Sequence, residues 1–142
     1  MSASSGSPRV LVDTSAYYAL TDRGERTHQD AVVIQQRLIQ ERWRLWTTNF
    51  ILAETHALSL NRLGYHTALT VLQRIDASNT TIIRVTADDE SSARALIVRF
   101  HDKTFSLTDA LSFVVMERLD ISHAFSFDHN FTQYGLQLLI GR

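Results

Sequence analysis

The sequence has no cysteine among its 142 residues. This absence excludes a disulfide framework and zinc sites built from thiolates. It fits a reducing compartment, so we expect a cytoplasmic protein. Long hydrophobic runs are also missing, since no apolar stretch approaches the roughly 20 residues that span a bilayer. We therefore expect no membrane segment.

Proline and glycine are scarce, with one proline and five glycines. Because these two residues interrupt helices and strands, their scarcity predicts regular elements joined by short connections. The sequence also lacks a phosphate-binding glycine loop and a dinucleotide-binding fingerprint. The six histidines show no paired ligand spacing, which argues against a zinc site.

The sequence has no large excess of positive or negative charge, since the formal net charge is −1 and the isoelectric point is about 6.6. A protein with this balance has no overall basic surface that would attract nucleic acid. If nucleic acid is a partner, a local patch or a bound metal has to hold it.

The composition is otherwise that of a globular protein, at 44% hydrophobic and 20% charged residues. Residues 1–8 are rich in serine and contain no hydrophobic stretch, so we expect a disordered leader and not a signal peptide. Residues 9–142 have the usual size of one domain and contain no linker that would divide them.

Short apolar runs alternate along the chain with segments of helical periodicity. Strands are predicted over residues 9–13, 45–48, 81–85, 124–127 and 136–140. Helices are predicted over residues 14–20, 28–42, 49–63, 66–76, 87–100 and 107–119. Strands separated by helices favour an α/β fold with a parallel sheet and right-handed crossovers.

Polar residues at the predicted helix ends indicate how the helices begin and stop. Thr14 or Ser15 is expected near the start of the first helix, and Asn49 is expected to cap the third. Gly64 is expected to stop that third helix.

Four acidic residues lie where predicted elements begin or end, namely Asp13, Glu54, Asp109 and Asp128. Asp13 and Asp128 each follow a predicted strand, and ligands of open parallel sheets bind outside the carboxyl ends of the strands. Carboxylates in such places are costly unless a positive charge offsets them. A divalent cation with oxygen ligands is the natural candidate for that charge.

Each of the four acids also has a purely structural explanation. Asp13 can cap the helix that follows it, and Asp128 can close an Asx-type turn. Asp109 lies three residues after Ser106, as in a capping box. Glu54 can be a boundary residue whose carboxylate reaches solvent.

Glu54 has a further feature, because it lies three residues after Ile51 and four before Leu58. On a helix this spacing places all three on one stripe, which we expect to face inward.

Taken in order, these segments resemble the PIN-domain ribonucleases, most closely the VapC-type toxins of bacterial and archaeal toxin–antitoxin pairs. The matching segments are Val10-Leu11-Val12-Asp13-Thr14-Ser15-Ala16, Asn49-Phe50-Ile51-Leu52-Ala53-Glu54, Leu107-Thr108-Asp109-Ala110-Leu111-Ser112 and Phe127-Asp128-His129-Asn130-Phe131. The resemblance covers residues 9–139. The chain departs from the common pattern at Asn130, where an acid is often found.

The resemblance implies a three-layer α/β/α sandwich with a central, mainly parallel sheet. It also implies an endoribonuclease that uses Mg²⁺ or Mn²⁺ and leaves 5′-phosphate and 3′-hydroxyl ends. It further implies a homodimer and a small antitoxin protein as partner.

On this basis we assign the catalytic and metal-binding roles to Asp13, Glu54, Asp109 and Asp128. Secondary residues that would orient water or a carboxylate are Thr14, Ser15, Thr108, Ser112 and Asn130. Candidates for contact with RNA are Arg23, Arg26 and His129. Two other functions stay open at this point: a PIN nuclease with a housekeeping role in RNA processing, and a non-catalytic PIN-fold binding module.

Overall fold

The computed structural model describes residues 6–139, so residues 1–5 of the expected leader lie outside it. Its strands are β2 (Arg9–Val12), β3 (Arg44–Thr48), β4 (Thr81–Ile83), β5 (His123–Phe125) and β6 (Gln137–Leu138). Its helices are α1 (Thr14–Thr21), α2 (His28–Gln40), α3 (Asn49–Leu63), α4 (Tyr65–Ala77), α5 (Ala87–Arg99), α6 (Leu107–Leu119) and α7 (His129–Tyr134). None of these helices is long and apolar enough to cross a membrane.

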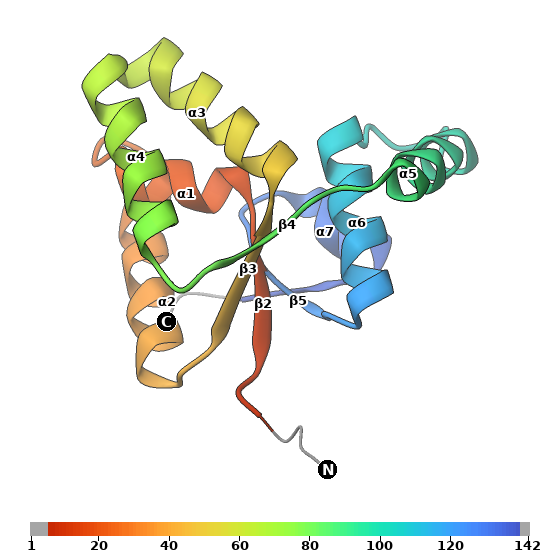
Figure 1. Ribbon diagram of the computed structural model, residues 1–142, viewed down its shortest axis with the longest axis horizontal. Coiled ribbons are helices and arrows are strands. Elements are labelled where there is room, and N and C mark those ends of the chain that lie inside the picture. The colour runs from red at the N-terminus through yellow and green to blue at the C-terminus, as the bar shows by residue number, and fades with distance from the viewer. Residues whose placement is uncertain (1–5, 140–142) are drawn as a thin grey trace.

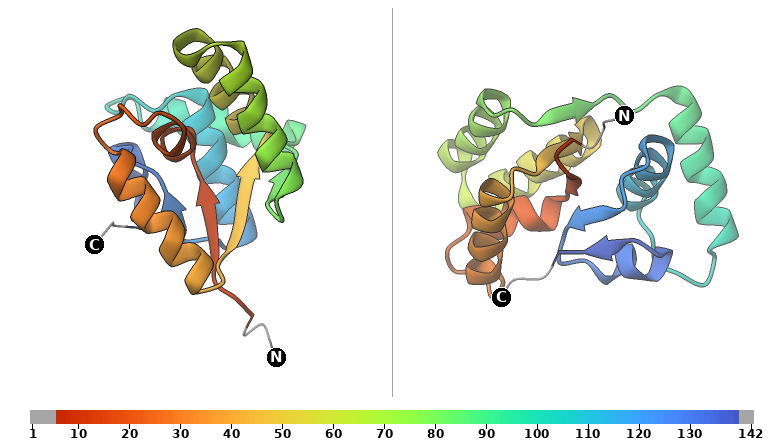
Figure 2. Two further views of the ribbon diagram at one scale, coloured as in Figure 1. Left: turned by 90° about the vertical axis from the view of Figure 1, so that its left-hand side faces the viewer. Right: turned by 90° about the horizontal axis from the view of Figure 1, so that it is seen from below.

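The strands form one sheet in the order β4-β3-β2-β5-β6, and every neighbouring pair is parallel. Helices α1 to α4 cover one face of the sheet and α5 to α7 the other (Figure 1). The expected three-layer α/β/α fold with a parallel sheet is therefore confirmed. A view along the sheet from below shows the two helical layers separately (Figure 2).

The central strand β2 is hydrophobic on both faces, because a parallel sheet with helices on each side is buried twice. Val10 and Val12 pack with residues of α1 and α2. Leu11, which points to the opposite face, packs with residues of α5 and α6. The three side chains are at most 2% exposed. This uninterrupted apolar run is what places the following residue, Asp13, at the edge of the sheet.

Most predicted elements are present, with ends that shift by a few residues. The strand predicted over residues 81–85 ends at Ile83, and the helix predicted over 28–42 ends at Gln40. Strand β5 begins at His123 and ends at Phe125, so Ser126 and Phe127 lie beyond it. Residue 140 of the last predicted strand lies outside the described residues.

The predicted cap of α3 was wrong, whereas the capping role considered for Asp13 is confirmed. The N-cap of α1 is Asp13, whose carboxylate accepts a hydrogen bond from the backbone N–H of Ser15. The N-cap of α3 is Thr48, whose hydroxyl accepts from the N–H of Ile51. Gly64 ends α3 as expected, at a φ of 91° that favours glycine.

Candidate active site

The carboxyl edge of the sheet carries the beginnings of α1, α3 and α6, which lie near one another at the top of Figure 1. Asp13 caps α1 directly after β2. Asp109 is the third residue of α6, and Glu54 lies in the second turn of α3. The fold therefore brings acids that are far apart in sequence to one edge of the sheet.

Asp13 is 5% exposed and is held by hydroxyl groups. Its Oδ2 accepts hydrogen bonds from Ser15 Oγ at 3.0 Å and from Ser126 Oγ at 2.9 Å. No side-chain donor among residues 6–139 reaches Oδ1. One oxygen of Asp13 is thus fixed by the protein, and the other is available to a ligand.

Burial raises the pKa of Asp13 from 3.8 to about 6. The hydroxyls of Ser126 and Ser15 act in the opposite direction and lower this pKa, whereas the negative charge of Asp109 raises it further. No cationic side chain of the described residues contributes to the balance. The buried carboxylate of Asp13 therefore has a second carboxylate near it, and neither aspartate forms a salt bridge within residues 6–139.

Asp109 is 9% exposed and forms the expected capping box with Ser106. Its Oδ2 accepts from the backbone N–H of Ser106 at 3.1 Å and from Asn130 Nδ2 at 3.0 Å. No donor in the described part of the chain reaches its Oδ1. As with Asp13, donors of the protein hold one carboxylate oxygen of Asp109, and the other oxygen accepts no such hydrogen bond within residues 6–139.

Glu54 is exposed, so its expected place on an inward stripe was wrong. The buried stripe of α3 runs through Ile51, Thr55 and Ser59 instead. Two of these three residues, Thr55 and Ser59, have small hydroxyl side chains, so a search for apolar residues does not reveal the buried stripe. Glu54 Oε1 accepts a hydrogen bond of 2.7 Å from the hydroxyl of Thr14, which brings Glu54 beside the start of α1.

Asp128 is the N-cap of α7, and its Oδ1 accepts from the backbone N–H of Asn130 at 2.9 Å. The turn expected at Asp128 is present, but it forms the start of α7, a helix that was not predicted. Asp128 is joined to Asp13 through Ser126, whose hydroxyl donates to Asp13 and accepts from the Asp128 N–H at 3.0 Å.

Ser126 is the residue of the site that sequence reasoning missed. It is 2% exposed and bonds to an aspartate 113 positions earlier in the chain. One signal was present, because residues two apart in an extended segment point to the same side, and Ser126 stands two before Asp128.

Ser15 and Thr14 contact the acids as expected. Thr108 and Ser112, the two proposed secondary residues that lie on α6, do not. Ser112 is buried and donates to the backbone carbonyl of Thr108 at 3.0 Å, one turn earlier in α6. The structure shows no side-chain hydrogen bond of Thr108 to an acid in the residues it describes. Their role in orienting water stays a prediction.

The candidate RNA-binding residues Arg23, Arg26 and His129 are exposed. Arg23 lines a cleft of about 520 Å³ together with His66 and Arg74 of α4, away from the acids. His129 is the first residue of α7 and is adjacent to Asp128.

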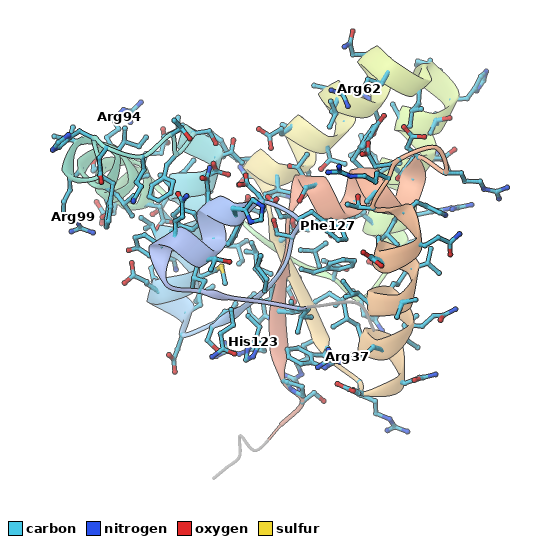
Figure 3. The ribbon with its side chains drawn as sticks, turned by 180° about the vertical axis from the view of Figure 1, so that it is seen from behind. Arg37, Arg62, Arg94, Arg99, His123 and Phe127 are labelled. Atoms are coloured by element: carbon cyan, nitrogen blue, oxygen red, sulfur yellow. The ribbon has the colours of Figure 1, made fainter. Side chains whose placement is uncertain are left out.

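Arginines on α5 and α6 do not form a free phosphate-binding patch. Arg94 pairs with Glu90 at 3.7 Å, and the guanidinium of Arg99 lies over the ring of Phe100. Figure 3 shows Arg94 and Arg99 on α5, on the opposite side of the molecule from Arg62.

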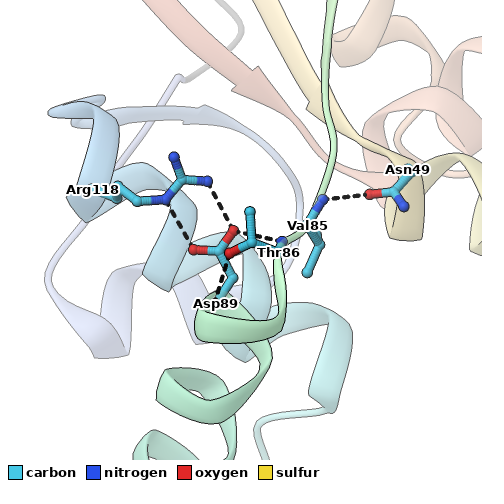
Figure 4. A network of polar contacts seen from close by, with 5 residues as sticks. All are labelled: Asn49, Val85, Thr86, Asp89 and Arg118. Carbon is cyan, nitrogen blue, oxygen red and sulfur yellow. Dashed lines mark hydrogen bonds and ion pairs between the residues drawn. The ribbon is translucent and has the colours of Figure 1, made fainter.

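A second buried aspartate, Asp89, shows how the fold neutralises a carboxylate that has only a structural role. Arg118 donates to both of its oxygens, at 2.9 and 2.8 Å, while Asp89 also forms a capping box with Thr86 (Figure 4). Burial raises the pKa of Asp89, but the hydrogen bonds of Arg118 and Thr86 outweigh burial and hold this pKa below its usual value. Asp13 has no such partner.

The oxygen donors at the carboxyl edge suit a hard divalent cation such as Mg²⁺, which uses few carboxylates and keeps several waters. In residues 6–139, no three carboxylate or imidazole groups already converge closely enough to hold a metal ion. Asp13 and Asp109 are held by donors from other elements, whereas Glu54 is exposed and accepts a hydrogen bond from Thr14. The residues therefore fit a cation held mainly by Asp13 and Asp109.

A parallel α/β sandwich with acidic residues at its carboxyl edge has the architecture expected of the PIN-domain proteins. Residues 10–136 match the PIN domain family, and the chain belongs to this family.

Its relatives include "23S rRNA-specific endonuclease VapC20" of Mycobacterium tuberculosis, which is 31% identical over 134 residues, or 89% of this chain and 94% of the relative. A VapC ribonuclease of Archaeoglobus fulgidus is 35% identical over 127 residues, which cover 87% of this chain and 79% of the relative.

Solved structures show the same similarity. The crystal structure of VapC20, described as a toxin that cleaves the sarcin–ricin loop, superposes with a TM-score of 0.84 at 30% identity, covering 92% of this chain and 98% of that one. VapBC2 from Rickettsia felis, bound to a DNA fragment from its promoter, gives 0.69 at 12% identity and covers 92% and 97%. The latter likeness concerns the fold alone.

Proposed function

We propose that this protein is a divalent-metal-dependent endoribonuclease and the toxin of a toxin–antitoxin pair. The observation that carries the proposal is the pair of buried aspartates, Asp13 and Asp109, neither of which forms a salt bridge within residues 6–139. The likeness to VapC endonucleases over nearly the whole chain supports the same activity.

In this proposal, Asp13 and Asp109 bind Mg²⁺ or Mn²⁺ through the oxygens that the protein leaves free. When bound, the cation neutralises charge on the scissile phosphate and lowers the pKa of a water ligand. Ser15 and Ser126 keep Asp13 in one orientation, because both hydroxyls donate to its Oδ2. Glu54, guided by Thr14, and Asp128 complete the acidic site, directly or through water.

The proposed substrate is a loop of 23S ribosomal RNA, because the relative VapC20, at 31% identity, is named a 23S rRNA-specific endonuclease and its structure is described as that of a toxin that cleaves the sarcin–ricin loop. RNA of this kind would be met in the cytoplasm, where we place the protein. The proposed partner is a small antitoxin, because the sequence resembles VapC-type toxins and the structure of VapC20, at 30% identity, is that of a toxin.

The test is cleavage of purified ribosomes by the wild-type protein and by Asp109→Asn, with new 5′-phosphate ends mapped by primer extension. Asp109→Asn keeps a side chain of the same shape that can still accept at the capping box, so we expect a folded protein with activity reduced by about 100-fold or more. Asp76→Asn, which replaces an exposed aspartate at the end of α4, is the control and should cleave like wild type.

Full activity of Asp109→Asn would contradict the proposed site. Absence of cleavage by the wild type on ribosomes, total RNA and transfer RNA, with Mg²⁺ and with Mn²⁺, would contradict the proposed activity and favour a binding role for the fold.

A further inference from the structure

The short helix α7 places a neutral amide against one of the two buried aspartates. Asn130 Nδ2 lies 3.0 Å from Asp109 Oδ2. A carboxylate oxygen only accepts hydrogen bonds, so the nitrogen of the amide has to face it. The contact is a donor meeting an anion, which is stronger than a bond between neutral groups.

Asn130 is itself held in place by the acid two residues before it. Its backbone N–H donates to Asp128 Oδ1 at 2.9 Å, and the N–H of Asp128 donates to Ser126. Ser126 donates to Asp13. A continuous chain of hydrogen bonds therefore runs from Asp13 through Ser126, Asp128 and Asn130 to Asp109.

The core fixes the helix that carries this amide. Phe131, the next residue, is fully buried, and its ring packs edge-on against Phe113 of α6 with centroids 5.0 Å apart. Helix α6 also carries Asp109. The amide and the carboxylate are thus attached to two elements that are packed rigidly together, which limits how far Asp109 can swing.

The neutrality of the Asn130 amide is as important as its position. The carboxylates of Asp13, Asp109 and Asp128 already gather at this edge of the sheet, so a further negative group here would add to the repulsion between them. Asn130 donates a hydrogen bond to Asp109 without adding charge. Together with the N–H of Ser106 it supplies two donors to Oδ2, and no donor among residues 6–139 reaches Oδ1.

We propose that Asn130 is a positioning residue that holds Asp109 for the cation and the substrate, while Asp128 holds Asn130. This inference rests on the proposed function for its consequence in catalysis. The sequence placed Asn130 only in a general set of secondary residues, whereas this inference specifies the carboxylate that Asn130 holds, Asp109, and the residue that holds Asn130.

The first test compares Asn130→Ala with Gln133→Ala, an exposed residue of the same helix that serves as matched control. Binding of Mn²⁺ is measured by calorimetry, and both variants are checked for cooperative thermal unfolding. Loss of a group that orients a metal ligand typically costs 10–100-fold in metal affinity or activity. We expect a loss of about that size in Mn²⁺ affinity and in kcat for Asn130→Ala, with KM for RNA changed by less than about threefold. Gln133→Ala should match wild type.

The second test needs neither metal nor RNA, so it remains informative if the proposed activity fails. In a chelating buffer near neutral pH, Asn130→Asp places a carboxylate against Asp109 Oδ2, whereas Gln133→Glu adds the same charge on the exposed side of α7. We expect a lower unfolding midpoint for Asn130→Asp than for Gln133→Glu. Equal midpoints, or wild-type Mn²⁺ affinity in Asn130→Ala, would overturn the inference.

Discussion

At the scale of single residues, the main contrast is between two buried aspartates. Asp89 is stabilised by a two-pronged contact with Arg118, whereas Asp13 is surrounded by hydroxyls and has Asp109 nearby. Isolated buried charges are costly, so the ionised form of Asp13 is unfavourable in the folded protein. The cation that we propose at this site would offset that cost.

This cost predicts how stability depends on pH. Because the pKa of Asp13 is about 6 in the folded protein and 3.8 ordinarily, folding favours its protonated form. The stabilising contribution is complete below the ordinary pKa and is lost as pH rises through 6, to a total of at most about 3 kcal/mol. Asp13→Asn removes this loss, so above pH 6 the metal-free variant should be more stable than wild type.

The measurement is urea unfolding with a chelator at pH 4.5 and pH 7, for wild type, Asp13→Asn and the exposed control Asp76→Asn. Other acids contribute equally to all three, so the difference between wild type and Asp13→Asn isolates Asp13. If that difference is the same at both pH values, the burial of an unpaired charge at Asp13 is disproved.

The residues of the site could be named from sequence only in part. Asp13 and Asp109 stood out because they follow a strand and open a helix. Ser126 could not be assigned, since its partner is 113 positions away and only the pairing of β2 with β5 brings them together. Glu54 was identified, but its orientation was misjudged because hydroxyl residues line the buried side of α3.

At the scale of elements, the strands and long helices were predicted because their periodicity is clear. Helix α7 was not, since its six residues are too few for a helical period to show. The cap of α3 was misplaced by one residue. Asn49, expected there, instead accepts from the N–H of Val85 at 3.0 Å and ties the chain after β4 to α3 (Figure 4). Such a long-range contact competes with the local capping role that the sequence suggests.

Helices α5 and α6 depend on the Asp89–Arg118 contact between them. Arg118→Met should leave Asp89, whose side chain is 3% exposed, with a buried unpaired charge. Removing one partner of a fully buried pair costs 3–5 kcal/mol, but the Arg118 side chain is 43% exposed, so we expect about 2 kcal/mol.

Urea unfolding measures this loss, and Arg94→Met is the matched control. The Arg94 side chain is 65% exposed and its ion pair with Glu90 is long, so that change should cost less than about 0.5 kcal/mol. Adding Asp89→Asn to Arg118→Met should recover part of the lost stability. If the two single arginine variants are equally stable, the contact is not stabilising the helix pair.

At the scale of the whole molecule, cation binding should raise the stability of the entire fold. A ligand at 100 times its Kd stabilises a folded protein by about 2.7 kcal/mol. For a chain of this size that corresponds to an increase of roughly 10 °C in the unfolding midpoint. We expect Mg²⁺ and Mn²⁺ to give such a shift in wild type and in Asp76→Asn, and Ca²⁺ or K⁺ to give less.

The same cations should give no shift in Asp13→Asn, measured by differential scanning fluorimetry at pH 7.5. An equal shift in that variant would show that the cations bind elsewhere on the protein.

The α/β class was predictable from the alternation of strands and helices, but the convergence of the acids was not. It follows from the strand order, in which β2 lies between two strands that are far from it in sequence.

That strand order also sets when the acidic edge can form as the chain folds. Asp13 follows β2, but its hydroxyl partner Ser126 follows β5, and Asn130, which contacts Asp109, lies on α7. Contacts between residues far apart in sequence require a long loop to close before they contribute to stability. The acidic edge is therefore completed late in folding, after β2 and β5 have paired.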